Sequence, residues 1–247
     1  MKLRLFLCTT AFLQAIATFA AGNAATDVTN QYVKNPGFDN SSTDGWQVDG
    51  EAGSLNADND CMRFFNGTCH IRQELKGLPK GRYRLSFQGF YRTTWQEQAY
   101  ERWSTKTENI TCFLYAGNAQ KKLISIYDAS LDYHPEGNAW SPDDGKTYYP
   151  DNRVAAKEFL AKGLYWNTLE FEAEGNITIG VICQENEEGN WCIIDNFKLE
   201  SIIPGGESWI DFTSNALKKA KGYPAADIAE ITGLSLEQIE KLHPEML

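Results

Sequence analysis

The chain has 247 residues, with 33 acidic against 23 basic side chains and a formal net charge of −10. This negative balance disfavours nucleic acid, anionic membrane surfaces and strongly anionic polysaccharides as partners, and leaves neutral sugars open. The length allows one large β-rich domain with a small appendage, and an aromatic content of 13% is ample for a hydrophobic core.

The first 24 residues have the pattern of a secretory signal peptide. Lys2 and Arg4 precede an apolar stretch over 5–21, and the small residues Gly22 and Ala24 stand where a signal peptidase would select them. An uncleaved membrane anchor is the alternative, although the apolar stretch is shorter than the ~20 residues of a spanning helix. Cleavage removes two of the 23 basic and none of the 33 acidic residues, which makes the net charge −12. We therefore expect an exported protein, located in the periplasm, on the outer cell surface or outside the cell.

Strand patterns dominate residues 25–203. Over 82–91, Tyr83, Leu85 and Phe87 alternate with polar residues, which predicts a half-buried strand. The segment LPKGRY at 78–83 is typical of a turn that leads into this strand. Over 175–200, two apolar runs flank a polar turn, which predicts an antiparallel hairpin that closes the sheet. Since no parallel βαβ alternation occurs, the pattern predicts a mainly β, two-sheet antiparallel sandwich.

The sequence changes character after Pro204-Gly205-Gly206. Three short helices are predicted, over 213–221, 225–231 and 235–242, and Ser235 begins a capping box. We expect 204–247 to form a small helical C-terminal segment that packs on the sandwich or docks a protein partner. A DNA-binding helix-turn-helix is disfavoured because this segment has no excess of basic over acidic residues and no Arg-rich stretch.

Five cysteines remain after signal cleavage, and in an exported protein they could pair. A hairpin centred between positions 187 and 188 would place Cys183 opposite Cys192, which makes these two the first candidate disulfide. Cys61 with Cys69 is the second candidate. An odd number leaves at least one thiol unpaired, and none of the five has the Cys-x-x-Cys spacing of a zinc site.

Two long polar and aromatic segments, 92–108 and 128–152, are the candidate functional region. Sugar binding needs flat apolar surfaces with polar groups beside them. The candidate stacking residues are Trp95, Tyr100, Trp103, Trp140, Tyr148 and Tyr149, and the candidate polar partners are Arg92, Asp132, His134, Asp151 and Asn152. The alternative is that these aromatic residues hold the long loops against the sandwich. Trp46, Trp166 and Trp191 lie in strand-like runs and are expected in the core.

An enzyme would need an acid and a base, or an activated nucleophile. The segment 128–152 holds carboxylates that a glycosidase could use, namely Asp132, Glu136, Asp143, Asp144 and Asp151. However, the chain has only three histidines and lacks a Gly-x-Ser-x-Gly elbow, a His-Glu-x-x-His motif and a phosphate loop. We therefore expect no catalytic activity.

Several phrases, in order over about 30–202, resemble the galactose-binding-domain-like jelly rolls of carbohydrate-binding modules in secreted bacterial proteins. They include NPGFD at 35–39, GFYR at 89–92, YPDN at 149–152 and DNF at 195–197. The resemblance implies a jelly-roll sandwich that travels with glycan-degrading machinery. It also implies a structural Ca²⁺ held by Asp39 and Asp195, because the first and last strands of such modules are adjacent. The alternative for Asp195 is a carboxylate that accepts backbone hydrogen bonds and binds no ion.

Together these observations predict an exported β-sandwich that binds a polysaccharide or oligosaccharide through its aromatic loops without catalysis. A protein-interaction or scaffold module of a surface assembly is the second hypothesis. A small glycan-active hydrolase is the third.

Overall fold

The computed structural model describes residues 25–50, 54–58, 60–185 and 187–202. The chain divides into two compact units, Asp27–Ser201 and a unit of the two terminal segments, Met1–Thr26 with Ile202–Leu247. The expected signal peptide, 1–24, and the expected helical segment, 204–247, lie outside the described residues. The architecture below is that of Asp27–Ser201.

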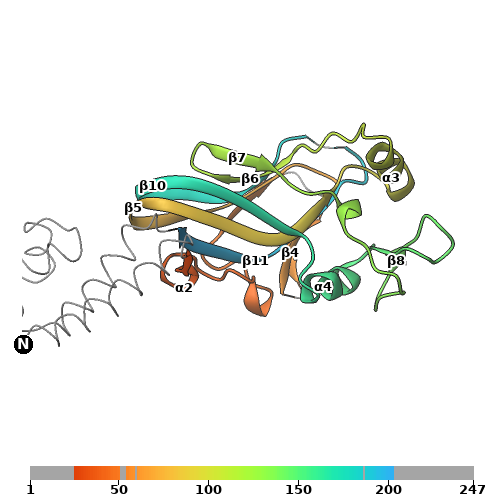
Figure 1. The fold of residues 1–247 in the computed structure, drawn as a ribbon, viewed down its shortest axis with the longest axis horizontal. Coiled ribbons are helices and arrows are strands. Elements are labelled where there is room, and N and C mark those ends of the chain that lie inside the picture. Colours follow the sequence, from red (N-terminus) through yellow and green to blue (C-terminus); the bar gives the residue numbers. More distant parts are fainter. Residues whose placement is uncertain (1–24, 51–53, 59, 186, 203–247) are drawn as a thin grey trace, which may run out of the picture. The chain divides into compact units, whose positions relative to one another are not determined.

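Strands are the main secondary structure of the described chain (Figure 1). None of its helices is long and apolar enough to cross a membrane, within the residues that the structure describes. In chain order the elements are β1 (Ala25–Asp27), α2 (Thr29–Tyr32), η1 (Asp39–Ser41), β2 (Gln47–Gly50), β3 (Ser54–Asp58), β4 (Cys61–Phe65), β5 (Cys69–Arg92), α3 (Gln96–Ser104), β6 (Cys112–Ala116), β7 (Ala119–Lys122), η2 (Ile126–Asp128), β8 (Ala139–Trp140), β9 (Tyr149–Pro150), α4 (Arg153–Ala161), β10 (Trp166–Cys183) and β11 (Trp191–Ile202).

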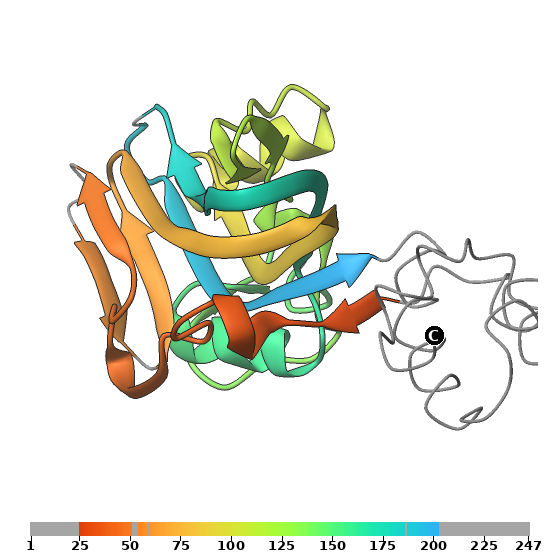
Figure 2. The same ribbon diagram turned by 90° about the vertical axis from the view of Figure 1, so that its left-hand side faces the viewer.

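Two long strands, β5 and β10, organise the fold. They pair antiparallel along almost their whole length, from Trp166 opposite Gln88 to Cys183 opposite Cys69, with register shifts around Gly175. Both strands curve strongly in Figure 2. The backbone pairing of β5 with β10 therefore continues from one layer of the molecule into the other.

The two layers follow from what pairs with each half of these strands. In the first layer, the beginning of β5 pairs with β2, and the end of β10 pairs with β6, which pairs with β7. In the second layer, the end of β5 neighbours β11, which pairs with β4 and through it with β3. The prediction of a mainly β, two-sheet antiparallel sandwich of jelly-roll type is confirmed. A separate two-stranded ribbon, β8 with β9, lies in the second long segment.

Two local predictions are wrong for one reason, which is the length of β5. The expected turn at 78–83 is the bend of a continuous strand, and the residues on either side pair with the same partner, β10. The expected closing hairpin over 175–200 does not form a strand pair, because β5 lies between β10 and β11 in the sheet. β10 therefore pairs with β5, which comes earlier in the chain, and not with β11, which follows it directly.

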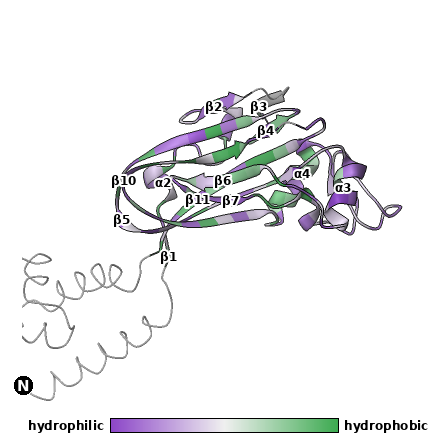
Figure 3. Cartoon of the chain, turned by 90° about the horizontal axis from the view of Figure 1, so that it is seen from above, coloured by the Kyte–Doolittle hydropathy of each residue, from purple (hydrophilic) through white to green (hydrophobic). Residues whose placement is uncertain are grey.

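The main hydrophobic core lies between the two layers. Alternate residues of β5, including Ile71, Leu75, Leu85 and Phe87, contribute to it. Figure 3 shows the hydrophobic residues concentrated on the strands, whereas α3 is mainly hydrophilic. The predicted alternation of Tyr83, Leu85 and Phe87 toward the core is confirmed.

A second core covers the outer face of the second layer. Phe90 and Ile193 point away from the main core and pack with Phe159 of α4, Tyr127 of η2 and Tyr149 of β9. Both faces of β5 are consequently buried from Phe87 to Arg92. This second core fixes the two long segments on the sandwich, and it therefore positions the candidate site.

Helices in these segments have clear local causes. Asn152 caps α4, because its side-chain oxygen accepts a hydrogen bond from the backbone N–H of Ala155 (2.9 Å). Ala155, Phe159 and Leu160 of α4 are buried against the sandwich. By contrast, α3 lies within 92–108, where the sequence analysis expected a loop.

Candidate functional site

Five aromatic rings meet where the two long segments lie on the sandwich, and we call them the aromatic cluster. They are Tyr100 and Trp103 of α3, Tyr127 of η2, Trp140 of β8 and Tyr149 of β9. The ring centroid of Tyr100 lies 5.5 Å from that of Trp103, 5.3 Å from that of Tyr127 and 5.3 Å from that of Trp140. The Tyr127 and Tyr149 centroids are 5.0 Å apart. These are favourable distances for aromatic pairs.

The cluster has an inner and an outer part. Tyr127 and Tyr149 are buried, whereas Tyr100, Trp103 and Trp140 are only half-buried. The Tyr127 hydroxyl donates to the backbone carbonyl of Gln96 (2.7 Å), which ties η2 to α3. Burial raises the pKa of Tyr149 to about 12. The inner rings hold the loops in place, and the outer rings leave part of their surface to solvent.

Carboxylates border the outer rings. The Trp103 indole N–H donates to Asp128 Oδ1 (2.9 Å), and the Lys106 ammonium lies 5.0 Å from the centroid of the Trp103 ring. The Ser125 hydroxyl donates to Glu108 (3.1 Å), and Ser125 N–H donates to the other oxygen of Asp128 (2.8 Å). Burial raises the pKa of Glu108 to about 7, and the nearby Asp128 charge adds to the shift. The cluster therefore has acidic groups at its edge.

Arg92 and Asp151, both predicted ligand contacts, bind each other. Arg92 is only 3% exposed, and its Nη1 donates to Asp151 Oδ1 (3.0 Å) while Nε and Nη2 donate to the Gly189 carbonyl. The guanidinium also lies 5.3 Å from the centroid of the Trp191 ring. A ligand could reach Arg92 only if this set of contacts opened, and a ligand role for Arg92 and Asp151 stays a prediction.

The structure brings together four predicted stacking residues, Tyr100, Trp103, Trp140 and Tyr149. The other two lie elsewhere: Trp95 packs edge-on against Phe65 (5.7 Å between centroids), and Tyr148 packs against His134 (5.0 Å). Among the polar candidates, Asp132 and His134 are exposed, and Asn152 is occupied as the cap of α4.

Tyr127 belongs to the cluster although the sequence analysis did not name it among the candidate site residues. The strand β7 ends at Lys122, and a capping box of Ser125 with Asp128 begins the short helix η2 instead. The spacing of Ser125 and Asp128 is the signal that could have identified this helix start.

Trp46 and Trp191 are buried, as predicted for core residues, but Trp166 is 44% exposed. The prediction for Trp166 is wrong because alternation along β10 turns its neighbours Tyr165 and Asn167 inward and its own ring outward. A strand-like run does not reveal which of its two faces is covered.

The two acids predicted as calcium ligands lie near one point. A Cβ atom built on Gly37 would lie 3.2 Å from Asp39 Oδ1, 3.7 Å from Asp195 Oδ1 and 3.8 Å from Asn196 Oδ1. Asp195 is only 1% exposed; it accepts from the Lys157 ammonium (2.8 Å) and from the backbone N–H of Asn196 (2.8 Å). Burial raises the pKa of the Asp195 carboxyl, and the Lys157 contact opposes this rise. Three side-chain oxygens are thus available near Gly37, and Lys157 already supplies one positive charge.

No group of three or more His, Cys, Asp and Glu residues that could hold a metal occurs in the described part of the chain. The oxygen set near Gly37 has two carboxylates and one amide, so a hard cation would complete its shell with backbone oxygens or water. Calcium at Asp39 and Asp195 stays a prediction.

The predicted disulfide between Cys183 and Cys192 is absent, and all five cysteines of the described chain are free and buried. In the sheet, Cys183 lies opposite Cys69 of β5 on one side and Cys112 of β6 on the other. The prediction is wrong because it assumed the local hairpin that β5 interrupts. Burial raises the pKa of Cys192 to about 11, so these thiols are inert at neutral pH.

No protein-family model and no curated protein matches this chain. The solved structures similar to it include a carbohydrate-binding module, TmCBM61, in complex with β-1,4-galactotriose. That structure is 19% identical, covers 68% of this chain and 96% of its own, and has a TM-score of 0.35. A family 35 carbohydrate-binding module from Clostridium thermocellum is 12% identical, with coverage of 63% and 87% and a TM-score of 0.27.

The enzymatically active domain of tailspike protein 4 from bacteriophage CBA120 is also similar. It is 12% identical, with a TM-score of 0.33, and the match covers 69% of this chain and 21% of that one. Carbohydrate-binding modules are thus among the structures that this chain resembles. At these TM-scores the likeness carries no argument about function, which has to rest on the site.

Proposed function

We propose that this protein is a non-catalytic glycan-binding module and that the outer rings of the aromatic cluster contact the sugar. The observation that carries the proposal is the arrangement of Tyr100, Trp103 and Trp140, half-buried on a base formed by Tyr127 and Tyr149. Their fixed positions reduce the entropy that would be lost when a sugar ring stacks on them. Export from the cell, favoured by the first 24 residues, is part of the same proposal.

Polar groups beside the rings would contact the sugar hydroxyls. A carboxylate has about four lone-pair sites. Asp128 uses two of them, for the Trp103 indole and the Ser125 backbone N–H. Asp128 therefore keeps capacity for a hydroxyl next to the Trp103 ring. Apolar faces with a few convergent polar groups are what saccharide recognition requires.

Truncation of the outer rings tests the proposal. The mature chain would be titrated by calorimetry with neutral oligosaccharides of two to six rings built from glucose, galactose, mannose or xylose. For a saccharide that binds, Trp103→Ala and Trp140→Ala should each weaken the affinity at least about tenfold, because central aromatic contacts dominate binding energies.

The matched control is Val154→Ala, since Val154 is an exposed apolar residue of α4 outside the cluster. Affinities that are unchanged in both tryptophan variants would contradict the assignment of the site. Release of new reducing ends from any saccharide of the panel would contradict the non-catalytic part of the proposal.

A structural calcium ion held by Asp39 and Asp195, with the amide oxygen of Asn196, is a second part of the proposed function. The support is the approach of the three oxygens to one point beside Gly37. An ion that binds only the folded protein stabilises it by about 2.7 kcal/mol at a concentration one hundred times its Kd. We therefore expect the thermal unfolding midpoint to rise with millimolar Ca²⁺ and to fall with a chelator.

Asp39→Ala should abolish the calcium response without a large loss of stability, because Asp39 is exposed. A midpoint that is the same in calcium and in chelator would mean that Lys157 alone compensates the charge of Asp195.

A further inference from the structure

A pocket of about 370 Å³ lies apart from the aromatic cluster. Its walls come from three segments: the chain over 27–39, Trp166 at the start of β10, and 196–198 of β11. The volume is in the range of small-molecule sites, ~300–1,000 Å³. The pocket shares no residue with the aromatic cluster.

Trp166 supplies a flat apolar wall. Its side chain is 44% exposed, and within the described residues it makes no contact with another aromatic ring. Its neighbours in the chain, Tyr165 just before β10 and Asn167 on β10, are buried and hydrogen-bonded. The backbone on which Trp166 stands is therefore fixed, while the ring itself is open to a partner.

Polar groups at the same pocket have unused hydrogen-bonding capacity. Within the described chain, the side chains of Asn30 and Asp39 have no hydrogen-bond partner, and neither does Oδ1 of Asn196. The Asn196 amide nitrogen donates to Gln88 Oε1 (2.9 Å), and Gln88 in turn donates to the carbonyl of Leu160 (2.7 Å). This chain of hydrogen bonds orients the Asn196 amide before any ligand arrives.

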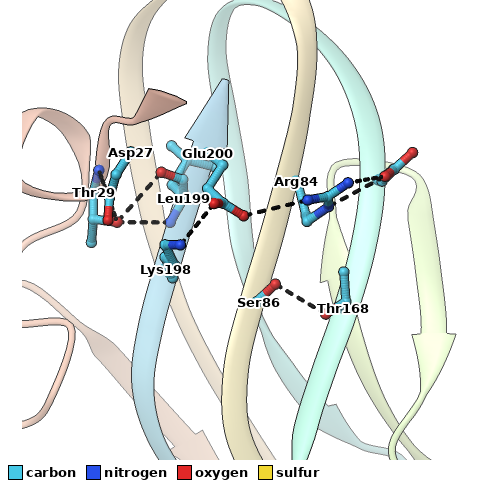
Figure 4. A network of polar contacts seen from close by, with 9 residues as sticks. Asp27, Thr29, Arg84, Ser86, Thr168, Lys198, Leu199 and Glu200 are labelled. Carbon is cyan, nitrogen blue, oxygen red and sulfur yellow. Dashed lines mark hydrogen bonds and ion pairs between the residues drawn. The ribbon is translucent and has the colours of Figure 1, made fainter. Parts of the chain in front are cut away.

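Lys198 of the pocket wall belongs to a series of paired charged side chains (Figure 4). Lys198 donates to Glu200 (2.7 Å), Glu200 lies 3.7 Å from Arg84, and Arg84 donates to Glu170 (2.9 Å). Asp27 accepts from both the backbone N–H and the hydroxyl of Thr29. A ligand here meets an apolar ring, amides and the Asp39 carboxylate, and this carboxylate disfavours an anion.

We propose that this pocket is a second binding site and that its ligand is a neutral saccharide. The C–H face of one pyranose ring stacks on Trp166, and its hydroxyls donate to Asp39 and Asn196 and exchange hydrogen bonds with Asn30. Amide and carboxylate groups that lack protein partners are the groups that can pair with hydroxyls without breaking an existing bond. The proposal goes beyond the aromatic cluster, because the two sites share no residue. It concerns the protein without calcium, because the proposed ion would use the same oxygens of Asp39 and Asn196.

The test is a comparison of two tryptophan variants in the same saccharide panel. Trp166 and Trp95 are 44% and 45% exposed, so their truncation removes equally exposed rings at different places. For at least one saccharide, Trp166→Ala should weaken the affinity at least about tenfold, and Trp95→Ala should leave it unchanged within twofold. Asn30→Ala, which changes an exposed side chain, should weaken the same saccharide and keep the fold intact.

The readouts separate the two sites. A saccharide that is sensitive to Trp166→Ala and insensitive to Trp140→Ala supports the pocket and contradicts the aromatic cluster as its binding site. Binding that is lost only in Trp140→Ala or Trp103→Ala overturns the pocket and leaves the cluster. A folded protein that binds no member of the panel, with and without calcium, overturns both.

Discussion

The aromatic residues of the two candidate sites are held in opposite ways. In the aromatic cluster each ring packs on other rings, and the centroids of Tyr127 and Tyr100 each lie within 6.0 Å of those of the other four rings. In the pocket, Trp166 lies at the surface of a strand whose neighbouring positions are buried. In the cluster, the same side chains hold the loops in place and would contact the ligand. In the pocket, Trp166 would contact the ligand, whereas its buried neighbours hold the strand in place. Substitutions should therefore affect stability and binding together at the first site and independently at the second.

Truncation at the centre of the cluster should have the largest effect on stability. Tyr127 is buried and its hydroxyl holds Gln96, so we expect Tyr127→Ala to lower the free energy of unfolding by about 3–5 kcal/mol. Trp166→Ala removes an exposed ring and should cost less than about 1 kcal/mol. Urea denaturation of the two variants and the wild type measures both values.

Tyr127→Phe is the matched control, because it keeps the ring and removes only the hydrogen bond to Gln96. It should cost about 1 kcal/mol. If Tyr127→Ala were no more destabilising than Trp166→Ala, the cluster would not hold the loops, and the contrast between the two sites would fail.

The sequence predicted the layers of the fold well because alternation is a local property. Tyr83, Leu85 and Phe87 face the main core as their period of two requires. The strand order was not accessible in this way. Nothing in the apolar runs over 175–200 indicates that β5, about one hundred residues earlier, lies between β10 and β11. The predicted disulfide between Cys183 and Cys192 was wrong for the same reason, because β5 lies between the two strands that carry these residues.

The candidate site was predicted in part for a similar reason. Composition marked the two long segments as functional, and four of their aromatic residues do meet. Trp166 was wrongly assigned to the core. A strand pattern shows that alternate side chains lie on opposite faces, but it does not show which face is buried. Asn196 adds to the difficulty. Its φ of 53° shifts the alternation of β11, so that Ile194 and Phe197 both face the main core while Asn196 and Lys198 line the pocket.

A smaller effect, confined to the aromatic cluster, should appear as a pH dependence of stability. Burial raises the pKa of Glu108 to about 7, well above the value of about 4.3 for an unfolded chain. The folded state therefore binds a proton that the unfolded state releases, and deprotonation of Glu108 lowers stability as the pH rises from about 4.5 to about 7. Other carboxylates change stability with pH as well, so the variant Glu108→Gln is needed to isolate this contribution.

We expect Glu108→Gln to resemble the wild type near pH 4.5, where Glu108 is protonated and accepts from Ser125 much as a glutamine would. Above about pH 7 the variant should be more stable by about 1–2 kcal/mol, a range that allows for the partial exposure of the carboxyl. Denaturant unfolding of both proteins at several pH values measures the difference. A gap that stays constant across this range would show that Glu108 ionises like a surface carboxylate, and the edge of the cluster would then be as open to water as the rim of the Trp166 pocket.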